Sequence, residues 1–217
     1  MSKEGILNDL NETQREVNMN NRFMGLFLIL AICLMLPLQS YAATPMETVE
    51  KGVNNLLKTL GDPAFKAQTK DQQIATLGTE IEKVFDFTEL SKRTLGRDWK
   101  KMSAAQQTEF VKLFKQLLQG VYADRLLEYS DQKVLFDKEI TPKKGRAEVQ
   151  SYLQTSDGKK IPLFYRLTDK GGSWKVYDVI IEGVSMVKNY RTQFRDILAK
   201  DSPDKLLEIL RDKVNKT

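Results

Sequence analysis

Hydrophobic and polar residues follow two different periods along this chain, and the period changes near residue 130. Up to that point apolar residues recur every three to four positions, which is typical of amphipathic helices. From residue 133 to residue 182 apolar and polar residues alternate, which indicates β-strands. The helical period returns after Gly183. Helices, then strands, then helices again predict an α+β fold.

The predicted helices carry recognisable start and stop signals. The first begins at a capping box formed by Thr44 and Glu47, with proline at the first helical position. The longest begins where Ser103 and Gln106 form a second capping box. The helices are expected, in chain order, at about 45–60, 71–85, 87–94, 104–129, 185–200 and 203–214.

The strands are expected to form consecutive antiparallel hairpins, because short runs of turn residues separate them. Their expected spans are about 133–140, 146–155, 160–168 and 173–182. Both faces of the last strand carry large apolar residues, so we expect both faces to be covered. Simple alternation assigns Trp174, Val176 and Ile180 to one face and Tyr177, Val179 and Ile181 to the other.

These elements predict a curved antiparallel sheet of about four strands, wrapped by N-terminal and C-terminal helices. Such a sheet encloses a space between the layers, which is filled either by the protein's own side chains or by a ligand in an apolar pocket. Periodicity leaves this choice open. Residues 43–217 are expected to form a single domain, since their number suits one hydrophobic core better than two.

The residues before this domain have the pattern of a cleavable secretory signal. Residues 23–36 are almost wholly apolar, and Arg22 supplies the preceding positive charge. Ser40 and Ala42 provide small residues at the third and first positions before a cut, so we expect cleavage after Ala42. The run of about 14 apolar residues is shorter than the roughly 20 needed to span a bilayer, which argues against an uncut anchor.

The same segment predicts where the precursor starts and what the mature chain lacks. A cut after Ala43 would put bulky Tyr41 in a small-residue position and is the less favoured register. Residues 1–18 are net acidic, whereas Met19 begins an ordinary positive leader, so we expect translation to begin at Met19. The single cysteine, Cys33, would leave with the signal, and the sequence has no histidine. Mechanisms that use a thiol or an imidazole are thereby excluded from the mature chain.

The charge of the mature chain is mildly positive. The full chain has 34 basic and 29 acidic residues, of which three and four lie in residues 1–42, leaving a net charge of +6. The lysine pairs Lys100-Lys101, Lys143-Lys144 and Lys159-Lys160 fall in expected loops rather than on one face. We therefore predict no nucleic-acid partner. These loops are either simply solvated or attracted to an anionic membrane surface or an acidic partner.

Candidate catalytic and metal-binding groups are weak in this sequence. Ser185 lacks the second glycine of a nucleophile elbow and is better explained as a helix cap. Asp178 and Glu182, four residues apart, are better explained as a structural network with Arg191 or Arg97 than as an acid/base pair. No metal-ligand spacing and no glycine-rich phosphate loop is present. We expect neither catalysis nor a metal or cofactor.

Three stretches resemble a known family. The strongest is Tyr177 to Phe194, YDVIIEGVSMVKNYRTQF, and it is supported by LGRDW at residues 95–99 and FVKLFKQLL at residues 110–118. In this order they resemble the MlaC family of periplasmic phospholipid-binding proteins, also known as toluene-tolerance auxiliary proteins. The resemblance covers about residues 45–200.

The resemblance implies a fold, a function and partners. The fold would be related to the nuclear-transport-factor type, with helices over the concave side of the sheet. The protein would carry a phospholipid across the periplasm between an outer-membrane lipoprotein and porin complex and an inner-membrane ABC transporter with its substrate-binding ring component. It would thereby maintain the lipid asymmetry of the outer membrane.

The residues expected to contact the acyl chains are chosen by periodicity on the longest helix and the last two strands. They are Phe114, Leu117, Val121, Tyr122, Leu163, Tyr165, Val179 and Ile181. The face of the sheet that lines the pocket is not determined by this pattern. Asp178, Asn189 and Arg191 also match the family motif, and we expect them to organise the turn from strand to helix.

Two alternatives to a lipid carrier remain. In the first, the apolar stripes form only core, and the domain is an adaptor that binds no lipid. In the second, carboxylates in a pocket catalyse an isomerisation or a hydrolysis, which the absence of histidine disfavours.

Overall fold

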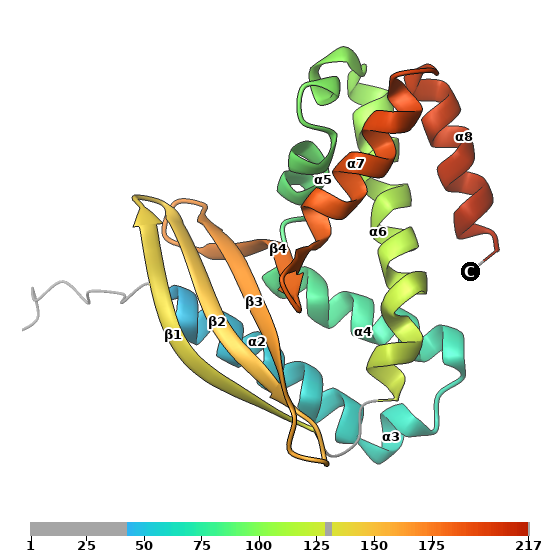
Figure 1. Cartoon of the computed structure of the whole chain (residues 1–217). Helices are drawn as coiled ribbons and strands as arrows, with labels where there is room; N and C mark the ends of the chain where they lie inside the picture. The colour runs from blue at the N-terminus through green and yellow to red at the C-terminus, as the bar shows by residue number, and fades with distance from the viewer. Residues whose placement is uncertain (1–42, 129–131, 217) are drawn as a thin grey trace, which may run out of the picture. The chain divides into compact units, whose positions relative to one another are not determined.

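The computed structural model describes residues 43–128 and 132–216 of the chain. The predicted export signal over residues 1–42, with Met19 and Cys33, lies outside the described residues. The order of elements is the predicted one, with helices before and after an antiparallel sheet (Figure 1). Within the described ranges, no helix is long and apolar enough to cross a bilayer.

Eight helical segments and five strands make up the described residues. The helices are α2 (Pro45–Gly61), α3 (Pro63–Lys66), α4 (Lys70–Val84), α5 (Phe87–Leu95), the 3-10 helix η1 (Asp98–Lys101), α6 (Ala104–Leu127), α7 (Met186–Leu198) and α8 (Pro203–Val214). The strands are β1 (Lys133–Lys143), β2 (Arg146–Gln154), β3 (Lys160–Asp169), β4 (Trp174–Ile181) and β5 (Val184–Ser185).

The capping signals act where the sequence places them. Thr44 and Ser103 each accept a hydrogen bond from the backbone of the third helical residue, and both capping boxes are complete. One start was misplaced: α4 begins at Lys70 rather than Asp71, because Thr69 forms a further capping box with Gln72. The short segments α3 and η1 were not predicted, since a single turn carries no measurable apolar period.

The sheet order is β1-β2-β3-β4-β5, and every neighbouring pair is antiparallel. The four long strands agree with the predicted hairpins. The expectation that the helical period returns directly after Gly183 was wrong, because β5 follows Gly183 and pairs with β4 across a two-residue turn. Glu182 and Gly183 have φ values of 50° and 81° there. Positive φ at both positions is what a tight hairpin turn requires.

The predicted faces of β4 were also wrong, because the strand contains a bulge. Arg166 of β3 is opposite Asp178, but the next residue, Leu167, is opposite Val176. Tyr177 is therefore an extra residue, and an extra residue reverses the alternation beyond it. As a result, Val176 and Val179 pack in the same cluster rather than on opposite faces.

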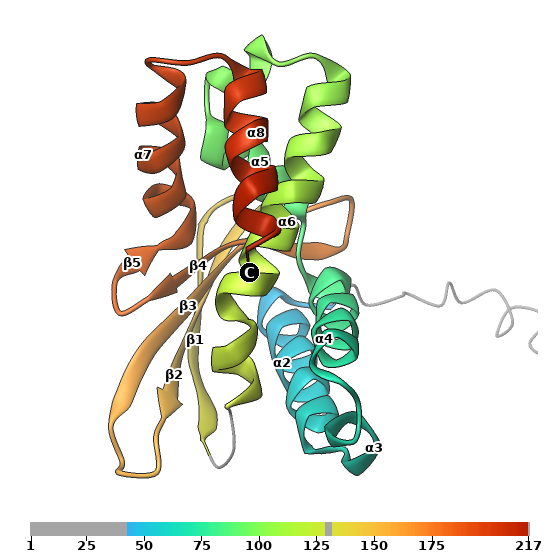
Figure 2. The same cartoon turned by 90° about the vertical axis from the view of Figure 1, so that its right-hand side faces the viewer.

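Both sides of β4 are covered, as predicted. Helix α2 packs against β1, β2 and β4, while α5 and α7 contact β4 as well. Figure 2 places α7 above β4 and α2 below it. On one side, α2 approaches α4 closely: a side chain at Gly52 would collide with Val84, at 2.5 Å from its nearest methyl carbon.

The apolar side chains form two main cores. The helical core lies among α5, α6, α7 and α8, and its centre is a group of aromatic rings whose centroids are 5.0–5.7 Å apart. These rings belong to Phe110, Phe114, Tyr190 and Phe194. The sheet core lies between the strands and α2, around Val49, Val149, Leu167 and Val176. A small third cluster joins α2, α3 and α4 near the end of α6.

Candidate lipid-binding site

The four predicted site residues on the sheet share one face. Leu163 is opposite Ile181, and Tyr165 is opposite Val179. All four belong to or border the sheet core, which is the face that carries α2. The structure therefore places all four residues on the face of the sheet that carries α2.

These four residues differ in how far the helices cover them. Tyr165 and Val179 are 8% and 7% exposed and lie within the sheet core. Leu163, two residues before Tyr165, and Ile181, two residues after Val179, form the next pair on this face and are only half-buried. Cover by the protein's own side chains thus decreases along β3 and β4 toward Leu163 and Ile181.

The four predicted site residues on α6 show a similar change along the helix. Phe114 is fully buried among the rings of the helical core, and Leu117 is nearly so. One turn further on, Val121 is 43% exposed and Tyr122 is half-buried. The first half of α6 is therefore closed core, and the second half leaves apolar side chains partly uncovered.

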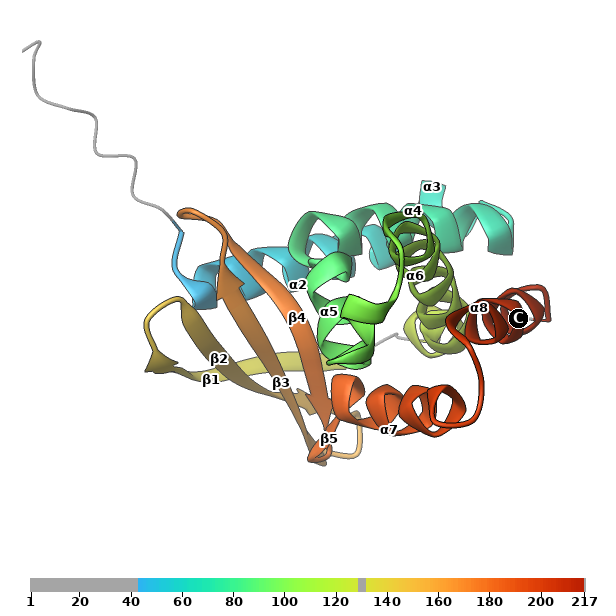
Figure 3. The same cartoon turned by 90° about the horizontal axis from the view of Figure 1, so that it is seen from above.

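The second half of α6 does not pack on the sheet. The neighbours of α6 are α8, α5, α4 and, through its aromatic rings, α7, and within the described residues it makes no extended contact with any strand. Figure 1 and Figure 3 both show α6 lying apart from the strands. Apolar residues on α6, on the strands and on the helices beside them are half-buried, and we call them the half-buried set: Val53, Leu56, Leu57, Tyr122, Leu126, Phe136, Leu163, Ile181 and Met186.

A groove of about 300 Å³ lies among α6, α7 and α8 and includes two of the predicted residues. Its lining consists of Leu117, Val121, Tyr190, Gln193, Lys213 and Lys216. The last four were not singled out from the sequence. Their signal was weak, because α7 and α8 are distant in sequence from α6 and only tertiary packing brings the three together.

Tyr190 connects the groove to the helical core. Its ring centroid is 5.0 Å from that of Phe114. Burial raises the pKa of Tyr190 to about 12, and nearby Tyr122 adds to the effect. The hydroxyl therefore keeps its proton at neutral pH and can act as a hydrogen-bond donor.

A second hollow of about 670 Å³ lies between α5, α6 and the β3–β4 turn, and it is lined largely by charged residues. Two ion pairs cross it, Lys115 to Glu82 at 2.8 Å and Lys170 to Asp86 at 2.9 Å. Burial opposes ionisation of Asp86, but the backbone N–H of Glu89 and the Lys170 ammonium outweigh it and lower the pKa of Asp86. None of the predicted site residues lines this hollow.

Asp178 has a structural role at the junction of β4 and α7. It is 2% exposed and accepts hydrogen bonds from the Ser185 hydroxyl at 2.6 Å and the Val187 N–H at 3.0 Å. Its arginine partner is Arg166, at 3.5 Å, rather than the expected Arg191 or Arg97. These contacts join the last long strand to α7, as expected for Asp178.

The other motif residues are used differently. Ser185 caps α7, as predicted, by accepting a hydrogen bond from the Lys188 N–H at 3.1 Å. Arg191 does not organise the turn but donates to the carbonyl oxygen of Arg93, which ties α7 to α5. Asn189 accepts a hydrogen bond from Gln193 one turn away on the same helix. In the described residues, no cluster of carboxylates has the arrangement of a metal site.

The fold and these sites define an α+β domain in which several apolar residues of the helices and of the sheet are only half-buried. Comparison with known proteins identifies the family. The MlaC protein family model matches residues 50–212, so the chain belongs to the MlaC family.

Two relatives and one solved structure illustrate this membership. The toluene tolerance protein Ttg2D of Pseudomonas putida is 31% identical over 185 residues, covering 83% of this chain and 84% of the relative. The intermembrane phospholipid transport system binding protein MlaC of Haemophilus influenzae is 33% identical over 119 residues, 53% of this chain and 56% of the relative. A phospholipid-binding protein from Ralstonia solanacearum, solved with a phospholipid, is 27% identical, with a TM-score of 0.74 over 80% of this chain and 98% of its own.

Proposed function

We propose that this protein is a periplasmic phospholipid carrier that shelters acyl chains between α6 and the sheet. The observation that carries the proposal is the half-buried set, which leaves apolar side chains uncovered on layers that do not pack on each other. The name of the Haemophilus influenzae relative and the ligand of the Ralstonia solanacearum structure support a phospholipid as the ligand.

The thermodynamic need for such a carrier is large. Two acyl chains contain on the order of 30 methylene groups, and each costs about 0.8 kcal/mol to expose to water, roughly 25 kcal/mol in all. Apolar side chains around the tails remove most of this cost, and because no covalent bond is changed, the transfer of the lipid needs no catalytic group. This is the role of a carrier rather than of an enzyme.

The residues that contact the acyl chains are inferred from how far each predicted side chain is exposed. Val121 and Tyr122 on α6 and Leu163 and Ile181 on the sheet have uncovered apolar surface, so they contact the tails directly. The other four predicted residues, Phe114, Leu117, Tyr165 and Val179, form the closed cores on either side. They support the walls of the site, and they touch a tail only where the layers separate.

The route of the carrier is inferred from the family. The protein is exported with cleavage after Ala42 and moves lipid between an outer-membrane lipoprotein and porin complex and an inner-membrane ABC transporter, which preserves outer-membrane lipid asymmetry. The exposed pair Lys143 and Lys144, at the β1–β2 turn, is a first docking surface to test. Unchanged lipid delivery by the Lys143→Glu, Lys144→Glu double variant would exclude that surface.

Lipid extraction and native mass spectrometry of protein purified from the periplasm test the carrier function. We expect bound phospholipid in the unmodified protein and its loss when Leu163 and Ile181 are both replaced by Asp, because charged groups would then face the tails. The matched control replaces Leu135 and Ile140 of β1 by Asp, since both are exposed and lie outside the apolar cores. Unmodified protein that carries no lipid and takes up none from liposomes would contradict the proposal.

A further inference from the structure

The groove among α6, α7 and α8 differs from the half-buried set in its chemistry. Its floor is apolar, formed by Leu117 and Val121, but its rim carries polar and cationic side chains. Lys213 lies in the last turn of α8 and Lys216 lies two residues after the end of that helix, and none of the six lining residues is acidic. The groove therefore has a net positive rim over an apolar floor.

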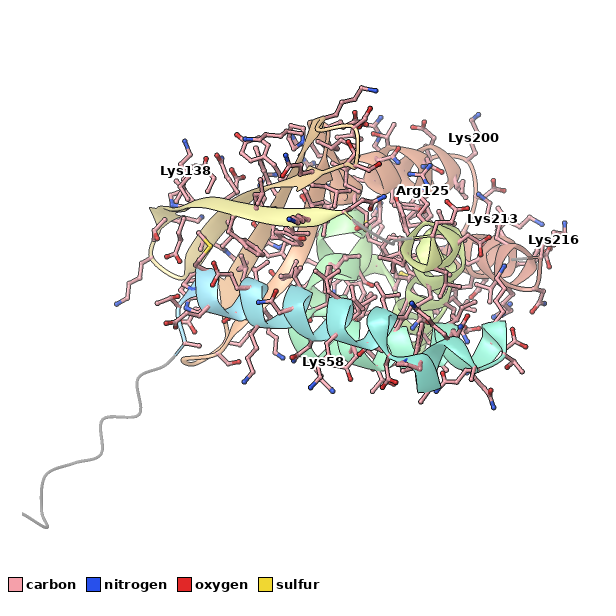
Figure 4. All side chains as sticks on the ribbon, turned by 90° about the horizontal axis from the view of Figure 1, so that it is seen from below. Lys58, Arg125, Lys138, Lys200, Lys213 and Lys216 are labelled. Carbon is pink, nitrogen blue, oxygen red and sulfur yellow. The ribbon has the colours of Figure 1, made fainter. Side chains whose placement is uncertain are left out.

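Figure 4 shows these cations together with their surroundings. Lys213 and Lys216 lie on the α8 side of α6, and Arg125 is on α6 itself, one helical turn after Val121. Lys138 lies on β1, at the far side of the same view, and Lys58 lies on α2. The groove cations are thus separated from other exposed lysines that serve as controls.

The groove adjoins the half-buried set at Tyr190. Tyr190 lies in the wall of the groove and belongs to the helical core, against which Tyr122 and Met186 of the set pack. An amphiphilic molecule lying across Tyr190 would therefore meet apolar surface on one side and cations on the other. The neutral hydroxyl of Tyr190 and the amide of Gln193 add hydrogen-bond donors at the boundary.

From this juxtaposition we propose that the groove binds the phosphate group of the phospholipid whose acyl chains contact the half-buried set. The inference rests on the proposed carrier function. It adds to the contacts with the acyl chains a second point at which the protein holds the lipid. Lys213 and Lys216 attract the phosphate charge, and Tyr190 and Gln193 donate hydrogen bonds to its oxygens.

The choice of lysine has a consequence for selectivity. A lysine ammonium acts as a compact point charge and imposes no fixed two-pronged geometry on its partner. The groove consequently recognises the phosphate that all glycerophospholipids share, and it discriminates little among the groups attached to that phosphate. A diacylglycerol, which has the same tails and no phosphate, lacks this attachment.

The test measures binding of lipid-free protein to phosphatidylglycerol and to a diacylglycerol with the same acyl chains. Replacement of Lys213 and Lys216 by Glu should weaken phosphatidylglycerol binding about tenfold, since each exposed charge contributes modestly, and leave diacylglycerol binding unchanged. The control replaces Lys58 and Lys138 by Glu, which changes the net charge equally but leaves the groove intact. The control should weaken phosphatidylglycerol binding less than twofold.

The outcomes separate this inference from the carrier function. If the unmodified protein binds neither lipid, the carrier function fails. If it binds both lipids and the two double variants behave alike toward phosphatidylglycerol, only the phosphate site is overturned. Glycerol 3-phosphate is the soluble phosphate used as a competitor. If it displaces phosphatidylglycerol at the same concentration at which phosphatidylglycerol itself binds, the groove is a site for free phosphate esters, and its assignment to a lipid headgroup is overturned.

A spin label provides a positional test. Phosphatidylethanolamine with a nitroxide on its headgroup should broaden the amide signals of Gln193 and Lys216 more strongly than that of Lys138. A nitroxide near the end of a tail should instead broaden the signals of Leu163 and Ile181. The reverse pattern would place the headgroup elsewhere and refute the inference.

Discussion

The helical core and the half-buried set are built from the same kinds of residues, but they are filled differently. In the helical core Phe114, Tyr190 and Phe194 contact one another and leave almost no surface exposed. In the half-buried set, apolar residues of α2, α6, α7 and three strands remain partly uncovered. The first region is closed by the protein's own side chains, and the second is only partly covered by them.

Helix α6 shows the cause of the difference, because it contributes to both regions. Its first half is covered by α5, α7 and α8, whereas its second half faces strands that it does not contact extensively. One continuous apolar stripe therefore serves as core at one end and as exposed apolar surface at the other. The closed half contributes to the stability of the fold, and the open half is where we propose that the acyl chains bind.

The largest expected effect comes from the closed region. Phe114→Ala should lower the free energy of unfolding by about 3–5 kcal/mol, because it removes a fully buried ring and leaves a cavity. Urea denaturation measures the change. A loss below about 1 kcal/mol would mean that the helical core is not closed around this ring.

Alkaline pH tests the same core through Tyr190. Its pKa is raised from 10 to about 12 in the folded protein, so the unfolded chain loses this proton first as the pH rises. Stability due to this group is complete below pH 10 and declines between pH 10 and 12, by about 2–3 kcal/mol in total. Urea denaturation at pH 8 and pH 11 should show a smaller decline in Tyr190→Phe, and equal declines in both proteins would contradict the burial of this hydroxyl.

A smaller effect is expected at the junction between the two regions. Asp178→Asn weakens charge-assisted hydrogen bonds from Ser185 and Val187 and should cost about 2 kcal/mol of unfolding free energy. Exposed Asp196→Asn on α7 is the matched control and should change little. Lipid content measured by extraction should persist in both, and its loss from folded Asp178→Asn protein would assign Asp178 a direct role in binding.

The smallest change in stability should accompany a large change in ligand binding. Leu163→Ala removes a half-buried side chain, so unfolding in the absence of lipid should change by only about 1 kcal/mol. Its retained phospholipid, measured by native mass spectrometry, should fall several-fold. A destabilisation as large as that of Phe114→Ala would show that Leu163 belongs to a closed core.

Much of the fold could be predicted because its signals are local. Thr44, Ser103 and Ser185 act within one helical turn, and each caps the helix that was expected. The short strand β5 and the bulge at Tyr177 were missed. Both depend on pairing with a neighbouring strand, which one strand's own pattern does not reveal.

The candidate site was only partly predictable. Periodicity correctly identified apolar stripes, but it did not distinguish buried Phe114 from exposed Val121 on the same helix. It also gave no indication that Lys213 and Lys216 lie beside Val121. That juxtaposition depends on the packing of α6, α7 and α8.

The sequence by itself determined the α+β order, the helix caps, the hairpins and the family, because each is encoded by neighbouring residues or by a contiguous motif. Only the tertiary structure decided which face of the sheet carries α2, which half of α6 is closed and where the cations gather. Those properties depend on contacts between residues far apart in the chain, and burial is a property of the whole assembly of elements rather than of any one of them.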